Sequence, residues 1–143
     1  MAYIAHKEKN FEKFLMNHFG ISIPEGISIF YKEGIRIGSN SIRNSNIIGE
    51  FGYAAADAGF NPTHSFIHNF GHLAKKNRIN LTYVEAKSFA AGSDLSCDFG
   101  KSSKYVIAIY KDHAIGLGQY DPNQKKLINK IPKKATRDMI NEF

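Results

Sequence analysis

The segment KYVIAIYKDHAIGLGQYDPNQKKLINKIPKKATR, residues Lys104 to Arg137, contains three apolar runs separated by two turn signals. The runs are rich in the β-branched and aromatic residues that favour strands, and they span Tyr105–Tyr110, Ala114–Tyr120 and Leu127–Ile131. The turn signals are Lys111-Asp112-His113 and Asp121-Pro122-Asn123, and Pro132 ends the last run. This pattern predicts a three-stranded antiparallel meander with tight connections.

The last predicted strand and the segment that follows it are strongly basic. Two glycines of the middle strand, Gly116 and Gly118, lie on one face, a spacing that marks a bulge, a barrel corner or a close approach of the backbone. We therefore expect a compact β unit with a basic edge. The basic residues are Lys125, Lys126, Lys130, Lys133, Lys134 and Arg137.

Length and composition are those of an ordinary globular protein. A chain of 143 residues suits one domain, or one domain with a small appendage, and can bury roughly two-thirds of its unfolded surface. The single cysteine, Cys97, excludes an internal disulfide framework and a cysteine-based zinc cluster. The sequence has neither a signal peptide nor an apolar run of roughly 18 residues. We therefore expect a cytoplasmic protein with no membrane partner.

The net charge of the chain favours a polyanionic partner. It is +6 at pH 7, with an isoelectric point near 9.4. Lysine and arginine side chains that contact phosphates release counterions, so nucleic acid is the first partner to consider. Net charge alone also fits a basic protein that binds nothing specific.

The N-terminal part predicts a helix followed by a hairpin. Asn10–Gly20 has an aromatic stripe typical of a buried helix face, with Asn10 as the N-cap and Gly20 as the left-handed C-terminal residue. Alternation in Ile27–Tyr31 and Ile35–Ile37 predicts a β-hairpin. The segments that follow are a polar loop, a short strand and a stretch with no assignment, at Ser39–Asn46, Ile47–Phe51 and Gly52–Phe60.

A second helix is predicted after Asn61-Pro62, with Thr63 as its cap. It carries His64, His68 and His72 at four-residue spacing, which allows a zinc site if another ligand comes from elsewhere. Histidines along a helix edge are more often packing residues, and no carboxylate follows the first one as a metalloprotease helix requires.

A third helix is predicted from a capping box, Thr82 with Glu85, preceded by Leu81 as the hydrophobic staple. Val84 and Phe89 are expected to face inward, and Gly92 to end the helix.

Two nucleotide-binding motifs are present only in part. Gly100-Lys101-Ser102 ends like a phosphate-binding loop, but Leu95 replaces the required first glycine. Gly116-Leu117-Gly118 lacks the third glycine of a dinucleotide fingerprint. Cys97 has acidic neighbours, Asp94 and Asp98, which raise the pKa of a thiol and argue against a catalytic nucleophile.

Short motifs in this order resemble the C-terminal region of the Fmu/Sun-type rRNA cytosine-5 methyltransferases, and the likeness runs from Gly59 to Asp138. The matching motifs are Asn61-Pro62-Thr63-His64, Leu81-Thr82-x-x-Glu85-Ala86 with Gly92, Val106–Tyr110, Ile115–Gly118 and Asn129-Lys130-Ile131-Pro132-Lys133. The resemblance implies an α+β fold with a PUA-like module, a small curved β pseudo-barrel with packed helices. It also implies two regions: a small N-terminal α+β layer over 1–58 and a PUA-like RNA-binding domain over 59–143.

The catalytic domain of that family binds S-adenosylmethionine and carries catalytic cysteines. This chain has no room for that domain and only one cysteine, so it resembles stand-alone members assigned to ribosome biogenesis. From this comparison we expect a protein that is not an enzyme, needs no cofactor and contains no metal.

The predicted function is binding of structured RNA, rRNA or tRNA, in ribosome biogenesis or beside an RNA-modifying enzyme or a ribosomal particle. Such RNA is recognised through its shape, phosphates and 2′-hydroxyls. Tyr110 and Tyr120 are possible stacking residues, although packing explains them better. The predicted RNA-binding residues are Lys126, Lys130, Lys133, Lys134, Arg137, Lys75, Lys76, Arg78, Gly116 and Gly118.

Two alternatives remain open at this point. One is a small metal-dependent enzyme built on His64, His68 and His72. The other is a protein-interaction module that uses an exposed aromatic face of the first helix, Phe11 and Phe14.

Overall fold

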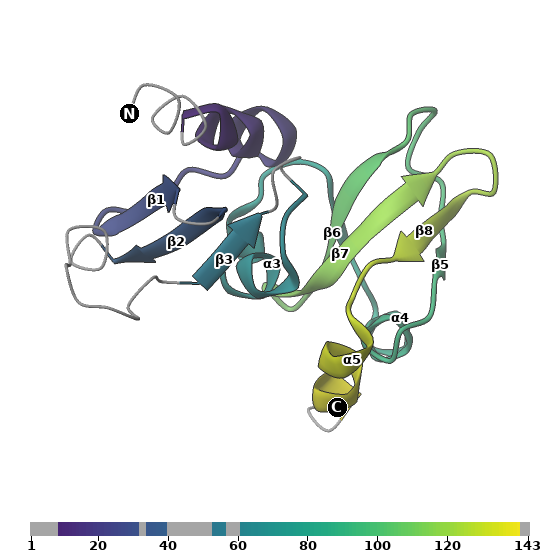
Figure 1. The fold of residues 1–143 in the computed structure, drawn as a ribbon. Coiled ribbons are helices and arrows are strands. Elements are labelled where there is room, and N and C mark those ends of the chain that lie inside the picture. Colours follow the sequence, from purple (N-terminus) through teal and green to yellow (C-terminus); the bar gives the residue numbers. More distant parts are fainter. Residues whose placement is uncertain (1–8, 32–33, 40–52, 57–60, 141–143) are drawn as a thin grey trace. The chain divides into compact units, whose positions relative to one another are not determined.

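The computed structural model describes residues 9–31, 34–39, 53–56 and 61–140, so the predicted polar loop and the strand Ile47–Phe51 lie almost entirely outside the described residues. The chain divides into two compact units, Met1–Phe66 and Ile67–Phe143, with the boundary inside helix α3 (His64–Phe70). Each unit contains its own β-sheet, and helices accompany both sheets (Figure 1). The α+β class predicted from sequence is confirmed.

The first unit begins with a helix that buries its aromatic stripe. Residues 9–14 are α-helical and continue into a π-helical turn, η1 (Leu15–Phe19), which ends at Gly20 in the left-handed region, φ 67°. Phe11 is fully buried, and its ring meets Phe66 edge-on at 5.8 Å. The prediction that Asn10 caps the helix is wrong, because residues 9 and 10 already lie inside it.

The sheet of the first unit has three antiparallel strands in the order β1-β2-β3. The predicted hairpin is confirmed by the pairing of the first two. The third lies in the stretch that had no assignment from sequence, and its Ala55 and Ala56 are buried. The strands are β1 (Ile27–Tyr31), β2 (Ile35–Ser39) and β3 (Tyr53–Ala56).

The sheet of the second unit contains the predicted meander at its centre and curls into a half-barrel (Figure 1). Its strand order is β4-β6-β7-β8-β5, and only the pair β4-β6 is parallel. A register shift between Ala108 and Ile109 marks a bulge, which bends a strand. The strands are β4 (Arg78–Asn80), β5 (Leu95–Ser96), β6 (Lys104–Tyr110), β7 (His113–Asp121) and β8 (Lys126–Asn129).

Helix α3 ends at Phe70 and is followed by a single 3-10 turn, η2 (Gly71–Leu73). The backbone N–H of Phe66 donates to Thr63 Oγ1 at 3.2 Å, which confirms Thr63 as the cap. Gly71 allows a close approach to the sheet, because a Cβ there would lie 2.7 Å from the Cβ of Ala114.

Helix α4 (Tyr83–Ala90) has the predicted capping box. Thr82 Oγ1 accepts from the N–H of Glu85 at 3.2 Å, and the carboxylate of Glu85 accepts from the N–H of Thr82 at 2.9 Å. Phe89 is buried as expected, and Gly92 ends the helix in the left-handed region, φ 105°. The prediction for Val84 is wrong: its side chain is 75% exposed.

Helix α5 (Lys133–Ile140) replaces the basic tail expected from sequence. The core of the second unit joins α4 to the sheet, since Phe89 packs with Val106, Tyr120 and Leu127. Among the described residues, no helix is long and apolar enough to cross a membrane.

Candidate nucleic-acid interface

The connection from β8 to α5 is held by the side chain of Asn129. Its amide nitrogen donates to the carbonyl oxygens of Phe89, at 2.8 Å, and Ser93, at 3.0 Å. Its side-chain oxygen accepts from the N–H of Ile131 at 2.9 Å. Its own N–H donates to Asp94 Oδ1 at 2.9 Å. Three of these hydrogen bonds fix the strand end against the end of α4 and the residues just after it, the fourth fixes the turn toward Ile131, and α5 begins four residues after Asn129.

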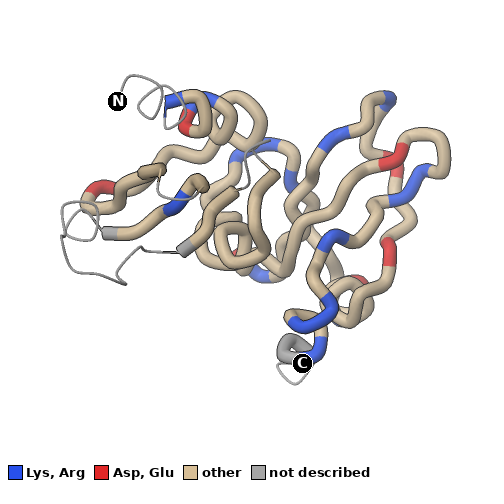
Figure 2. Tube along the Cα trace, in the orientation of Figure 1, with Lys and Arg blue, Asp and Glu red and all other residues tan. Residues whose placement is uncertain are grey.

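β8, this connection and α5 together present five cationic side chains to solvent, which we call the β8–α5 basic segment. Figure 2 shows Lys and Arg positions recurring along this part of the chain. The segment is anchored to the sheet between them, because the N–H of Lys130 donates to the carbonyl of Leu117 at 3.0 Å. Its members, all exposed, are Lys126, Lys130, Lys133, Lys134 and Arg137.

Two of these lysines lie at the N-terminal end of α5, where a positive charge destabilises a helix. Lys133 and Lys134 are the first two residues of α5, and the first turn of this helix has no acidic residue. The N-terminal end of a helix carries a partial positive charge, so a lysine there costs up to about 1 kcal/mol at low ionic strength. An anion bound at this position would remove that cost.

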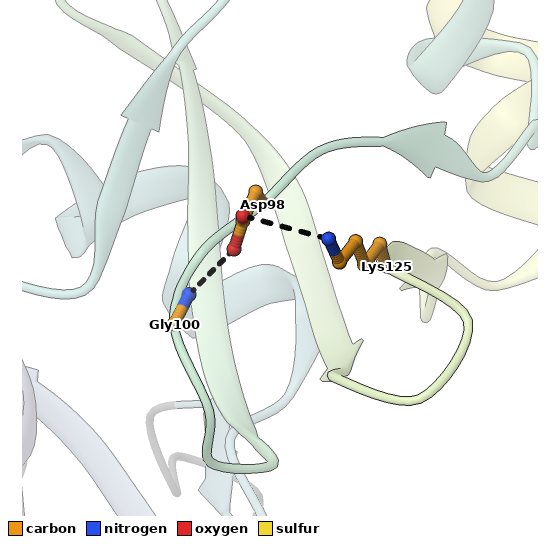
Figure 3. A network of polar contacts seen from close by, with 3 residues as sticks. All are labelled: Asp98, Gly100 and Lys125. Atoms are coloured by element: carbon orange, nitrogen blue, oxygen red, sulfur yellow. Dashed lines mark hydrogen bonds and ion pairs between the residues drawn. The ribbon is translucent and has the colours of Figure 1, made fainter.

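A sixth cation nearby has an acidic neighbour. Lys125 Nζ lies 4.0 Å from Asp98 Oδ2, and Asp98 Oδ1 accepts from the N–H of Gly100 at 3.3 Å (Figure 3). Both charged side chains are 69% exposed, so the pair contributes little to stability. Lys125 is therefore partly neutralised, unlike the β8–α5 basic segment.

The other predicted RNA-binding residues, Lys75, Lys76 and Arg78, differ in their contacts. Lys75 and Lys76 are exposed. The guanidinium of Arg78 donates to the carbonyl of Ala74 at 2.9 Å and to Asn80 Oδ1 at 3.3 Å, so it also ties β4 to the chain before it.

Gly116 and Gly118 lie buried in β7, the middle strand of the meander. A Cβ on Gly118 would meet Leu127, with Cδ1 at 2.6 Å and Cδ2 at 2.9 Å. Close packing of β7 against the Leu127 side chain accounts for Gly118. Burial in the middle strand does not favour contact of either glycine with RNA.

The two tyrosines considered for stacking differ in exposure. Tyr120 is fully buried and contacts Phe99, at 6.2 Å between ring centroids. Tyr110 is half-buried at the end of β6. An aromatic residue that sequence reasoning missed, Tyr83, is 48% exposed at the start of α4. Helical periodicity does not predict this exposure, because Tyr83 lies three residues before Ala86, which is buried.

The three histidines of the predicted second helix do not all lie in one α-helix. Phe70 leaves the helical region, φ −121°, and His72 follows in the 3-10 turn, so His72 does not continue the α-helical spacing of His64 and His68. Over residues 9–31, 34–39, 53–56 and 61–140, no three His, Cys, Asp or Glu side chains are grouped closely enough to hold a metal ion.

Neither the first helix nor the cysteine offers an alternative site. Phe11 is fully buried and Phe14 is half-buried, which does not favour an exposed aromatic docking face. Burial raises the pKa of the Cys97 thiol, and the negative charges of Asp98 and Glu85 add to that effect, while a hydrogen bond to the Leu127 backbone opposes it. A thiol with a raised pKa is a poor nucleophile at neutral pH.

No protein-family model matches the chain. The chain is similar to ribosomal RNA small subunit methyltransferase F of Psychromonas ingrahamii, 33% identical over 82 residues, which are 57% of this chain and 17% of that protein. It is also similar to the protein of the same name from Aeromonas hydrophila subsp. hydrophila, 28% identical over 80 residues, 56% of this chain and 16% of that protein. The chain thus matches about a sixth of the length of these relatives.

These similarities correct one expectation. The prediction that the chain is not an enzyme is contradicted, because both relatives are named as methyltransferases and the names point to an enzyme family. The expected relation to rRNA methyltransferases is supported at the level of the family name.

Proposed function

We propose that this chain acts in the methylation of small-subunit rRNA, and that its own part in that reaction is to bind structured rRNA. The β8–α5 basic segment, held in place by Asn129, is the observation that carries the proposal. The methyltransferases that match more than half of the chain are named for small-subunit rRNA, which supports this choice of nucleic acid.

The placement of charge supports phosphate binding by α5. Lys133 and Lys134 weaken the helix that carries them, so their charge serves something other than helix stability. The first backbone N–H groups of a helix and the adjacent ammonium groups together suit a phosphate oxygen. Arg137, one turn after Lys133, extends the same surface for a second phosphate.

We further propose that residues 59–143 form a PUA-like RNA-binding module. The curled sheet with α4 packed on one face suits such a module, because a stiff β unit can hold a basic edge at fixed spacing. Structured RNA presents phosphates and 2′-hydroxyls at spacings set by its helix, so a rigid edge can recognise its shape.

The glycine pair of β7 does not fit S-adenosylmethionine. Gly116-Leu117-Gly118 is the part of the chain most like a nucleotide-binding loop, but it is buried in β7, and Leu127 occupies the space beside Gly118. No part of the methyl-transfer step is assigned to the described residues. Their proposed role is to bind and orient rRNA.

The test is binding of a small-subunit rRNA transcript, measured by filter binding between low and physiological salt. Wild type is compared with the triple variant Lys133→Glu, Lys134→Glu, Arg137→Glu. The matched control reverses three exposed charges elsewhere, Lys9, Lys13 and Lys101, and so changes the net charge equally.

We expect the α5 variant to bind more weakly and with a smaller salt dependence. Each lost phosphate contact lowers the slope of log K against log salt by about 0.7 to 0.9. Acidic residues at positions 133 and 134 favour the start of α5, whereas Arg137→Glu removes a favourable cation from its last turn, so the two effects offset each other and thermal unfolding checks that the variant stays folded. Equal affinity for the α5 variant and the control, or no binding by wild type at low salt, would overturn the proposal.

A further inference from the structure

An aromatic pair lies at the surface where α4 begins. The rings of Tyr83 and Tyr110 are 6.1 Å apart at an interplanar angle of 58°. Tyr110 is the last residue of β6, and the N–H of Leu81 donates to the carbonyl of Ile109 at 2.8 Å, which brings the start of α4 to the end of that strand. The capping box at Thr82 then fixes Tyr83 as the first residue of the helix.

A lysine completes this group. Lys111 and Asp112 form a two-residue turn between β6 and β7 with positive φ at both, 47° and 64°, as a type I′ turn requires. Lys111 Nζ lies 5.4 Å from the centre of the Tyr110 ring. The ammonium group thus lies on one side of the pair, while 48% of Tyr83 remains accessible to solvent.

The exposed face of α4 connects this group to the β8–α5 basic segment. Lys87 is exposed one helical turn after Tyr83. At the other end of α4 the next helix is adjacent, since a Cβ on Gly92 would lie 3.6 Å from Thr136 Cγ2 in α5. α4 has eight residues, about 12 Å of axial length at 1.5 Å per residue, so both places lie within reach of one RNA segment.

We propose that Tyr83 is a stacking site for an unpaired base of the same RNA, with Lys87 and Lys111 beside the phosphates of that nucleotide. The inference rests on the proposed RNA binding and adds the kind of RNA that is preferred. A base stacks on an aromatic ring whatever its identity, and the contact contributes about 1–3 kcal/mol per base. Asp112 follows Lys111 in the turn, so the turn has no net charge and stacking supplies most of the affinity here.

The test uses the whole chain and two RNAs of equal length: a blunt hairpin, and a hairpin with an unpaired tail containing 2-aminopurine. We expect Tyr83→Ala to bind the tailed RNA about 5- to 150-fold more weakly, the equivalent of one lost stacked base. Affinity for the blunt hairpin and the salt slope should not change. Wild type should quench 2-aminopurine fluorescence on binding, and Tyr83→Ala should not.

Two variants separate stacking from structure. Tyr83→Phe keeps the ring and should keep both affinity and quenching. Val84→Ala changes the neighbouring, still more exposed side chain and should have no effect. Where wild type binds both RNAs, two results would overturn the inference. One is that Tyr83→Ala binds the tailed RNA as tightly as wild type does. The other is that Tyr83→Ala lowers the affinity for both RNAs by the same factor. Failure of wild type to bind either RNA overturns the proposed function itself.

Discussion

The side-chain amide nitrogen of Asn129 donates a hydrogen bond to the carbonyl oxygen of Phe89 at 2.8 Å, and the two residues are 40 positions apart. Phe89 lies in the last turn of α4, and its carbonyl also accepts from the N–H of Gly92 at 3.0 Å. Asn129 ends β8. One asparagine therefore adds a second donor at the C-terminal end of a helix and ties that end to the start of the segment that leads to α5.

Replacing Asn129 with Ala should destabilise the protein by about 1–3 kcal/mol, because it removes three side-chain hydrogen bonds and leaves the partly buried N–H of Ile131 without the amide oxygen that accepts from it. Chemical denaturation measures the change. RNA affinity should fall too, since Lys130 and Lys133 lose their fixed positions. Asn123→Ala, at an exposed turn position, is the control and should change stability by less than about 0.5 kcal/mol. A similar change for both variants would contradict the role given to Asn129.

Adding one methyl group to Gly118 should destabilise the second unit. The new Cβ would stand 2.6 Å from Leu127 Cδ1, too close for either atom to stay in place. Overpacking of this kind costs about 1–3 kcal/mol. Gly118→Ala, Leu127→Ala and the double variant form a cycle measured by urea unfolding, and the Gly118→Ala change should be smaller when Leu127 is already Ala. Additive changes would show that Leu127 is not the clashing group.

The capping box of α4 offers a clean local test. Thr82→Ala removes the oxygen that accepts from the N–H of Glu85, and a loss of about 1 kcal/mol is expected. Thr82→Ser keeps that oxygen and should retain stability. Thermal unfolding compares the two variants. If the serine variant were as unstable as the alanine variant, the methyl group rather than the cap would be responsible.

Alkylation of Cys97 should respond to pH in a direction set by burial. Burial raises the pKa of the thiol above its ordinary 9.0, so the reactive thiolate forms later than in an unfolded chain. The rate with iodoacetamide should therefore reach its midpoint at a higher pH in the native protein than in urea. A midpoint of the alkylation rate that is equal or lower in the native protein than in urea would contradict a raised pKa for Cys97.

The same shift has a consequence for stability. Because the folded pKa of Cys97 is raised, the unfolded chain releases its proton first as pH rises. The contribution of the neutral thiol is thus present below the unfolded pKa and is lost as pH rises through the folded value. Replacing Cys97 with Ala should flatten the fall in stability above pH 9.0, measured by urea unfolding at several pH values.

The sequence alone determined the features that depend on neighbouring residues. The meander follows from apolar runs and turn residues a few positions apart, and Thr82, Glu85 and Gly92 define the ends of α4 by contacts within one helical turn. The aromatic stripe of the first helix was recognisable because Phe11, Leu15 and Phe19 recur at helical spacing.

Only the tertiary structure decided features that depend on distant partners. β4 is only three residues long and forms by parallel pairing with β6, so no local sequence pattern predicts it. α5 is an eight-residue helix, too short to be stable alone, and it forms beside α4. Val84 is exposed because the sheet accepts only one face of α4. The basic residues are neighbours in the sequence, but their attachment to the end of α4 depends on Asn129, which bonds to carbonyls 40 and 36 positions earlier, and no sequence spacing encodes that contact.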